Sequence, residues 1–295
     1  MAMILYERGL LDLDTPVGAV VPEFVSKAEK DVRRHDVTLH MLLAHSSGLP
    51  AYEKLFLRAR TREALLHDVF TMALSGDPGS RAEYSDIGFI LLGAALERLA
   101  DETLDRFCQR EVFAPLGMTS TTFSPPLDIR SQIPPTADER GTGSTKAGSA
   151  FRGRIIQGEV QDENASILGG VAAQAGVFAT AEDIARFANS MLDPRGFLLP
   201  ATVSLFTRRE QTPAGTSRAL GWDTPSAPSQ SGKHFGPASF GHLGYTGTSL
   251  WIDPERQVSI TLLTNRTWPD CSNHAIKEVR PRFHDAVIEA LEKFV

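Results

Sequence analysis

The spacing of apolar and polar residues predicts helices through the middle of the chain and strands near its end. Residues 61–74 have the spacing of an amphipathic helix. A second helix is predicted directly after Tyr84-Ser85-Asp86, and residues 103–112 predict a third. The segment 275–294 is also helical in pattern, with an interruption at Pro281.

Polar residues mark where several helices begin. Thr38 is a suitable N-cap for a short helix over 39–44, and Thr180-Ala-Glu-Asp183 forms a capping box ahead of another amphipathic run. Residues 1–8 favour a helix that ends at Gly9, a natural residue just past a helix C-terminus. That helix has no N-cap, so it resembles the last two turns of a longer one.

The clearest strand pattern begins in a stretch rich in glycine. Residues 241–252 contain Gly241, Gly244 and Gly247 beside a single imidazole, His242, and residues 258–265 alternate as the antiparallel partner. Glycine in a strand marks a close approach to the backbone. This favours a substrate-binding strand, and an ordinary hairpin is the alternative that the pattern leaves open. Residues 124–150 and 211–240 are predicted to be loops.

Composition excludes several kinds of protein. The chain has 295 residues, 42% of them hydrophobic, and a net charge of −6 with scattered Lys and Arg. We therefore expect no nucleic-acid partner and no binding to an anionic membrane. No apolar run approaches the roughly 20 residues that cross a bilayer. The sequence as written shows no signal peptide, so it leaves the compartment undetermined.

The metal-binding residue types have no suitable spacing. Cys108 and Cys271 are too few for a disulfide framework. His35, His40 and His45 recur at intervals of five, which does not place them on one helix face. We therefore expect no metal site and no cofactor, and we interpret His45 as a structural residue of its loop.

Several short stretches together resemble one enzyme family. They are Leu42-Leu-Ala-His-Ser-Ser-Gly-Leu49, Tyr84-Ser-Asp86, Phe113-Ala-Pro-Leu-Gly-Met118, Gly241-His-Leu-Gly-Tyr-Thr-Gly247 and Trp251-Ile-Asp-Pro-Glu255. The chain resembles the serine β-lactamase-like hydrolases, in the branch of class C β-lactamases, DD-peptidases and esterases. The resemblance covers almost the whole chain, with the motifs in the family's order.

The resemblance implies a two-lobed α+β fold, in which helices flank an antiparallel sheet and a mostly helical lobe is inserted into it. We expect one domain over 1–295, with a helical lobe over about 31–165. The sheet-containing lobe would take about 1–30 and 166–295. The first strands of the sheet and the start of the nucleophile helix would be missing from this sequence.

The resemblance also assigns roles to residues of a site between the lobes. Tyr84 matches the catalytic Tyr of the Y-x-N element, and Asp86 takes the place of its Asn. His242 matches the K-T-G or H-x-G strand and would steady the Tyr and the substrate, with Gly244 beside it. The N–H of Tyr245 would be the second oxyanion donor. A packing tyrosine, a helix-start carboxylate and a solvated strand histidine remain the alternatives.

Two further residues affect the assignment. Gln174 stands where one subgroup of the family often has His, which weakens the link to that subgroup. Asp162 and Glu163 are adjacent carboxylates, and adjacent side chains rarely point the same way. A carboxylate pair for sugar cleavage is therefore not expected.

The family's nucleophile motif, S-x-x-K, is absent. No Lys of the chain has a Ser three residues before it, and no G-x-S-x-G elbow is present. We predict a serine hydrolase by family, acting on an acyl ester or amide such as a peptidoglycan peptide, a β-lactam or a small ester. The chain as given would be inactive or very slow. A truncated hydrolase is favoured, because Tyr84 and His242 keep catalytic identities; a non-catalytic binding homologue is the alternative.

Overall fold

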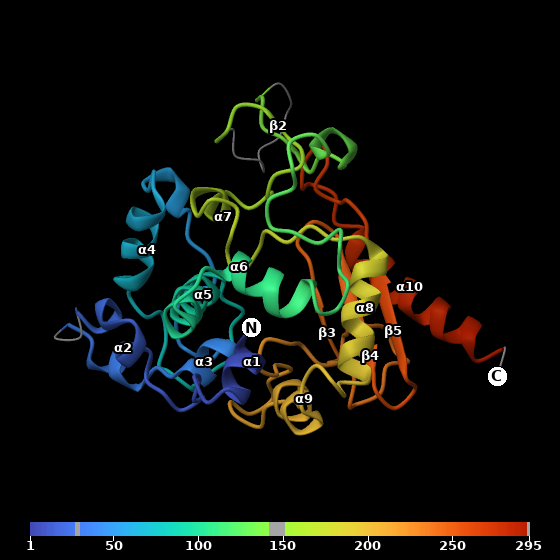
Figure 1. The fold of residues 1–295 in the computed structure, drawn as a ribbon, viewed down its shortest axis with the longest axis horizontal. Coiled ribbons are helices and arrows are strands. Elements are labelled where there is room, and N and C mark those ends of the chain that lie inside the picture. Colours follow the sequence, from blue (N-terminus) through green and yellow to red (C-terminus); the bar gives the residue numbers. More distant parts are fainter. Residues whose placement is uncertain (27–29, 142–150, 294–295) are drawn as a thin grey trace.

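A computed structural model describes residues 1–26, 30–141 and 151–293 of the chain. Helices gather on one side of the molecule, and a small antiparallel sheet with its covering helices lies on the other (Figure 1). Loops and the short strand β2, Ile155–Ile156, lie above both (Figure 1). This is the α+β arrangement that the sequence predicts.

The elements are short, and several are single turns. The α-helices are α1 Ala2–Glu7, α2 Val17–Val20, α3 Leu39–Leu43, α4 Arg62–Phe70, α5 Asp86–Ala100, α6 Leu104–Cys108, α7 Glu163–Ile167, α8 Ala181–Leu192, α9 Pro200–Thr207 and α10 Ile276–Leu291. The 3-10 turns are η1 Pro22–Val25, η2 Val32–Asp36, η3 Leu55–Leu57 and η5 Arg130–Gln132, and η4, Gln109–Phe113, is a π-helical turn. The strands are β1 Ala137–Asp138, β2 Ile155–Ile156, β3 Phe240–Leu243, β4 Ser249–Asp253 and β5 Val258–Leu262.

Helix α5 lies at the centre of the helical side, and α3, α4 and α6 pack against it. Most of its apolar residues are buried, which accounts for its position in the core. Its N-cap is Ser85, whose Oγ accepts the Gly88 N–H at 2.8 Å. The helix ends at Asp101, which adopts a left-handed conformation. The N-terminus of α5 therefore holds the Tyr84-Ser85-Asp86 stretch in a fixed position.

The main sheet has the order β3-β4-β5, with both pairs antiparallel. His242 lies opposite Leu250 in the register. Helix α8 contacts β4 and β5, and α10 contacts β5. Along its other edge, β5 pairs with no strand in the described part of the chain.

The glycines of this hairpin accommodate the protein's own atoms. A Cβ at Gly241 would lie 2.4 Å from the Leu250 carbonyl oxygen and 2.5 Å from the Trp251 ring. A Cβ at Gly244 would lie 2.0 Å from Oγ1 of Thr248. The close approach expected from the sequence is therefore made by β4 and its turn.

Several predicted elements are confirmed and others were missed. The Thr38 and Thr180 caps form as expected, each hydroxyl accepting a backbone N–H three residues on. Residues 103–112 are only partly α-helical, because the backbone changes to a π-turn at Gln109. Helix α9 and the short turns within 17–37 were not predicted. Residues 142–150 of the predicted long loop lie outside the described residues, and the lobe boundaries stay a prediction.

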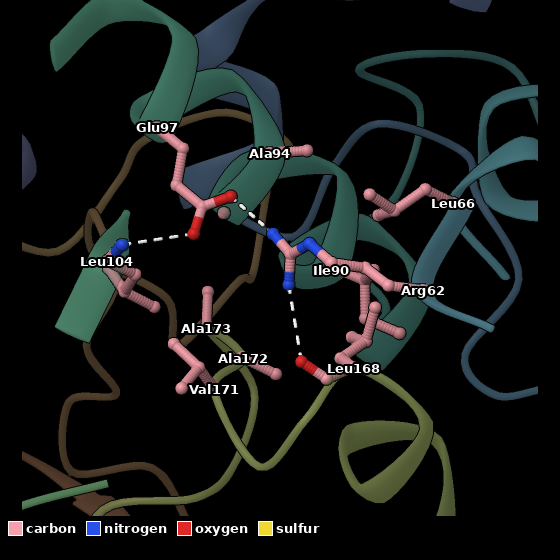
Figure 2. A pocket seen from close by; sticks show the side chains of 11 residues that line it. Arg62, Leu66, Ile90, Ala94, Glu97, Leu104, Leu168, Val171, Ala172 and Ala173 are labelled. Carbon is pink, nitrogen blue, oxygen red and sulfur yellow. Dashed lines mark hydrogen bonds and ion pairs between the residues drawn. The ribbon is translucent and has the colours of Figure 1, made fainter. Parts of the chain in front are cut away.

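A small pocket between α4, α5 and the segment 168–173 is a structural junction (Figure 2). Arg62 forms an ion pair with Glu97 and donates to the Leu168 carbonyl at 3.3 Å, while Glu97 accepts the Leu104 N–H at 3.0 Å. Its lining includes neither Tyr84 nor His242. No described helix is both long enough and apolar enough to cross a membrane.

Candidate active site

The fold brings Tyr84 and His242 together, although 157 residues separate them in the sequence. Tyr84 precedes the N-terminus of α5 and His242 lies on β3, and their ring centroids are 5.9 Å apart. Tyr84 is 39% exposed, so its ring is open to a ligand. The two residues with predicted catalytic roles therefore face each other across the junction of helix and sheet.

His45 holds the turn that carries Tyr84. Its Nδ1 accepts the Ser85 N–H at 3.0 Å, and its ring stacks on Phe89 with centroids 4.4 Å apart. The Tyr84 ring lies 4.6 Å away on a tilted plane. Burial, helped by the charges of Arg218 and His242, lowers the pKa of His45 to about 2. His45 is therefore neutral, which confirms its structural role and extends that role to the candidate site.

Arg218 is the nearest described cation to the Tyr84 ring. Its guanidinium carbon lies 5.5 Å from the ring centroid, and it pairs with Asp223 at 3.7 Å. Burial raises the pKa of Tyr84 above its usual range; the Asp86 carboxylate adds to the rise, and Arg218 opposes it. The phenol is therefore protonated at neutral pH.

His242 is also neutral. Burial lowers the pKa of its imidazole, Arg218 adds to the effect, and a hydrogen bond to the Leu243 carbonyl opposes it. That bond, 2.9 Å long, takes Nδ1 as its donor, so Nε2 keeps its lone pair. His242 can accept a proton or a hydrogen bond, but it does not attract a carboxylate by charge.

The other side of Tyr84 is acidic. Burial raises the pKa of Asp86 to about 6, and the charge of Asp162 adds to the rise. Burial likewise raises the pKa of Asp162, which caps α7 by accepting the Ala165 N–H at 2.6 Å. Tyr52 lies close enough for the charges of Asp162, Asp86 and Glu163 to raise its pKa further than burial alone. Asp86 thus begins α5 among acidic and aromatic neighbours.

The turn that follows β3 is fixed by two arginines. Arg280 donates to the carbonyl oxygens of Gly244 and Thr248, and Arg266 donates to the Tyr245 carbonyl at 2.7 Å. Arg266 also stacks on the Tyr245 ring, 4.1 Å from its centroid. The Tyr245 N–H has no hydrogen-bond partner in the part of the chain that is described. It is therefore free to donate to a ligand, and its role as an oxyanion donor stays a prediction.

A buried ion pair supports the segment before Asp162. Arg152 and Glu139 have side chains 7% and 3% exposed, and their charged atoms are 2.6 Å apart. Arg152 also donates to the carbonyls of Val160 and Gln161 at 2.8 and 2.7 Å. The cost of burying the two charges is thus offset by this fork of hydrogen bonds. The Arg152–Glu139 pair thus holds the segment that leads to Asp162, the N-cap of α7.

The site contains residues that sequence reasoning missed. Arg218, Arg266 and Tyr52 were not named, because isolated residues of these types in loop segments carry no periodic signal. Asp162 was considered only as half of an adjacent pair with Glu163, whereas in the structure its charge also raises the pKa of Asp86. Among the residues that are described, no cluster of three or more His, Cys, Asp or Glu could hold a metal ion.

A tyrosine at a helix start with an H-x-G strand opposite is the pattern on which the sequence resembles the β-lactamase-like serine hydrolases. Residues 1–278 match the family model described as Beta-lactamase, so the chain belongs to the β-lactamase family.

Two curated relatives are named as a carboxypeptidase and an amidase. The chain is 30% identical over 283 residues to a putative D-alanyl-D-alanine carboxypeptidase of Escherichia coli K12, covering 89% of this chain and 64% of the relative. It is 30% identical over 287 residues to an N-acetylmuramyl-L-alanine amidase of Bacillus subtilis 168, with the same two coverages. The chain thus spans less than two thirds of the length of these relatives.

Solved structures confirm the fold. EstCE1, a hydrolase with promiscuous acyltransferase activity, superposes with a TM-score of 0.71 at 22% identity, over 97% of this chain and 80% of its own. A β-lactamase from Mycobacterium bovis gives a TM-score of 0.63 at 22% identity, over 98% and 81%. At these identities the likeness establishes the β-lactamase-like fold alone.

Proposed function

We propose that these 295 residues form the substrate-recognition and proton-handling part of a serine acyl hydrolase. The substrate class is an acyl ester or amide, such as a peptidoglycan peptide, a β-lactam or a small ester. The observation that carries the proposal is the facing pair Tyr84 and His242, 5.9 Å apart between α5 and β3. The N–H of Tyr245, in the turn after β3, has no hydrogen-bond partner among the described residues and would add an oxyanion donor beside that strand.

The chemistry assigned to the site is acyl transfer. A serine oxygen bonds to the carbonyl carbon, the bond to the leaving alcohol or amine breaks, and the leaving group takes the serine proton. Water then repeats the exchange and frees the serine. In this scheme Tyr84 relays the proton, His242 accepts a hydrogen bond at Nε2, and the Tyr245 N–H binds the oxyanion.

We further propose that the chain as given does not complete this reaction. No Ser lies three residues before any Lys in its sequence. The raised pKa of Tyr84 agrees with this, because burial and Asp86 keep its phenol protonated. A tyrosine can act as a base only when cations near it lower its pKa, and Arg218 acting alone is outweighed.

Non-covalent binding tests the recognition part. We expect isothermal titration calorimetry to detect binding of D-alanyl-D-alanine, the dipeptide unit in the names of several relatives. Tyr84→Ala and His242→Ala should each weaken binding about tenfold, the effect of losing one or two polar contacts. Tyr6→Ala, which removes a tyrosine of α1 outside the site, is the control. Equal binding by all four proteins, or binding by none, would refute the proposed site.

A non-catalytic binding module is the second candidate. The observation that favours it is the facing pair Tyr84 and His242 in a sequence that lacks the S-x-x-K motif. Retained binding of the dipeptide with no release of D-alanine would support it, whereas measurable release would support an enzyme with an unrecognised nucleophile.

A further inference from the structure

The Asp86 side chain occupies the position that the family pattern gives to a carboxamide. A carboxamide can donate a hydrogen bond to a substrate carbonyl, whereas an ionised carboxylate can only accept one. Asp86 begins α5, with its backbone N–H bound to the Ala51 carbonyl at 2.8 Å. Its carboxylate accepts a hydrogen bond from the Tyr84 phenol and so lies beside that ring.

The surroundings of Asp86 are anionic and aromatic. The titratable groups acting on it are Tyr84 from the preceding turn and Asp162 from the N-terminus of α7. Tyr52 lies within reach of both carboxylates, and it is 40% exposed. Exposed tyrosine faces beside carboxylates suit a cation, because the ring faces are electron-rich.

The described cations near these carboxylates are paired with other residues. Neither Asp86 nor Asp162 forms an ion pair with an Arg or Lys in the described ranges 1–26, 30–141 and 151–293. Arg152 is the described cation that acts on Asp162, and its guanidinium is engaged by Glu139. Arg218 lies over the Tyr84 ring and pairs with Asp223.

A buried polar atom adjoins the same carboxylates. The Gln174 Nε2 donates to Asp162 at 3.5 Å, while the buried Gln174 Oε1 has no hydrogen-bond partner in the described structure. A buried acceptor without a donor is costly, and a ligand that brings N–H groups would relieve that cost. Asp86 accepts a hydrogen bond from the Tyr84 phenol and Asp162 accepts one from the Ala165 N–H, so of these three neighbouring acceptors Gln174 Oε1 is the one left without a donor in the described structure.

We propose that Asp86 is a specificity-determining residue that makes the site select substrates presenting a free protonated amine next to the acyl group, and reject those in which this amine is acylated. The inference rests on the proposed function, because it names the substrate class of that site. A protonated amine donates to Asp86 and gains from Asp162 and the tyrosine faces. An acylated amine presents a carbonyl oxygen, which the carboxylate repels.

The test compares D-alanyl-D-alanine with N-acetyl-D-alanyl-D-alanine by calorimetry, using the 295-residue chain at about pH 7, where the ligand amine remains protonated. We expect the free amine to bind at least about tenfold more tightly. Asp86→Asn should abolish this preference, since the carboxamide regains a donor. The matched control is Asp36→Asn, which removes the same charge from an exposed side chain of η2.

Lowering the pH gives an independent readout. The pKa of Asp86 is about 6, so it is ionised at pH 7 and largely protonated at about pH 5, while the ligand amine is charged at both. The amine preference should therefore fall at pH 5 in the native chain and stay flat in Asp86→Asn. Equal binding of the two ligands, or tighter binding of the acetylated one, would overturn the inference and leave the proposed function standing. Failure of both ligands to bind would overturn both.

Discussion

Nδ1 of His45 accepts the backbone N–H of Ser85 at 3.0 Å, and this bond ties the loop after α3 to the turn that presents Tyr84. An imidazole that accepts at Nδ1 must be unprotonated there. His45 adopts a positive φ of 55°, and it is 4% exposed. The geometry of the candidate site therefore depends on a buried histidine that stays neutral.

The first prediction concerns acid stability. In the folded state the pKa of His45 is about 2, against an ordinary value of 6.5, so between these pH values the unfolded chain binds a proton that the folded chain does not. The free energy of unfolding should therefore fall as the pH drops below 6.5. His45→Asn keeps an acceptor and tolerates positive φ, so urea unfolding should show a shallower acid loss. If the free energy of unfolding of the variant falls with pH as steeply as that of the native chain, His45 is not the origin of the acid loss.

The second prediction concerns Tyr84 and Asp86. The negative charge of Asp86 helps to raise the pKa of the Tyr84 phenol. Asp86→Asn should therefore shift the ionisation of Tyr84 to lower pH in an ultraviolet titration. The signal of Tyr84 is isolated by subtracting the same titration of Tyr84→Phe variants. Asp36→Asn should leave the curve unchanged, and an equal shift in that control would argue for a general charge effect.

The third prediction tests why Gly244 is glycine. A Cβ there would lie 2.0 Å from Oγ1 of Thr248, so Gly244→Ala should destabilise the protein by about 2 kcal/mol through overpacking. Adding Thr248→Ala removes the clashing oxygen and should restore part of the loss. Thermal or urea unfolding of both single variants and the double variant measures the coupling. If the stability losses of the two single variants simply add in the double variant, the predicted clash between Cβ of residue 244 and Thr248 Oγ1 is absent.

The fourth prediction concerns the Arg152–Glu139 pair. Both side chains are buried, so Glu139→Gln leaves the Arg152 charge without its partner and should cost about 3 kcal/mol in urea unfolding. Asp193→Asn breaks the exposed pair with Arg195 and should change little. If Glu139→Gln lowers the free energy of unfolding no more than Asp193→Asn does, Glu139 does not stabilise the buried charge of Arg152.

Much of the fold followed from local signals in the sequence. Thr38, Ser85 and Thr180 each cap a helix through a hydroxyl oxygen, which is a short-range interaction that sequence spacing reveals. The hairpin of β4 and β5 followed from alternation in the same way. The π-turn at Gln109 and helix α9 were missed, because tertiary packing decides them.

Only some of the site residues could be predicted from the sequence. Tyr84 and His242 could be named because each lies in a motif, and the structure brings them together. Arg218 and Asp162 reach the same place from loops and a short helix start, where no periodicity indicates a neighbour. The state of His242 was also out of reach, since burial and Arg218 make it neutral.

Covalent labelling tests the central claim most directly, namely that this chain keeps the recognition residues of the family without a working nucleophile. Folded protein is incubated with a fluorescent penicillin and with a fluorophosphonate, and its intact mass is measured, with a labelled penicillin-binding enzyme as the positive control. The account predicts no adduct on a chain that still binds D-alanyl-D-alanine. A stoichiometric adduct would contradict it, and peptide mapping would then identify the serine responsible.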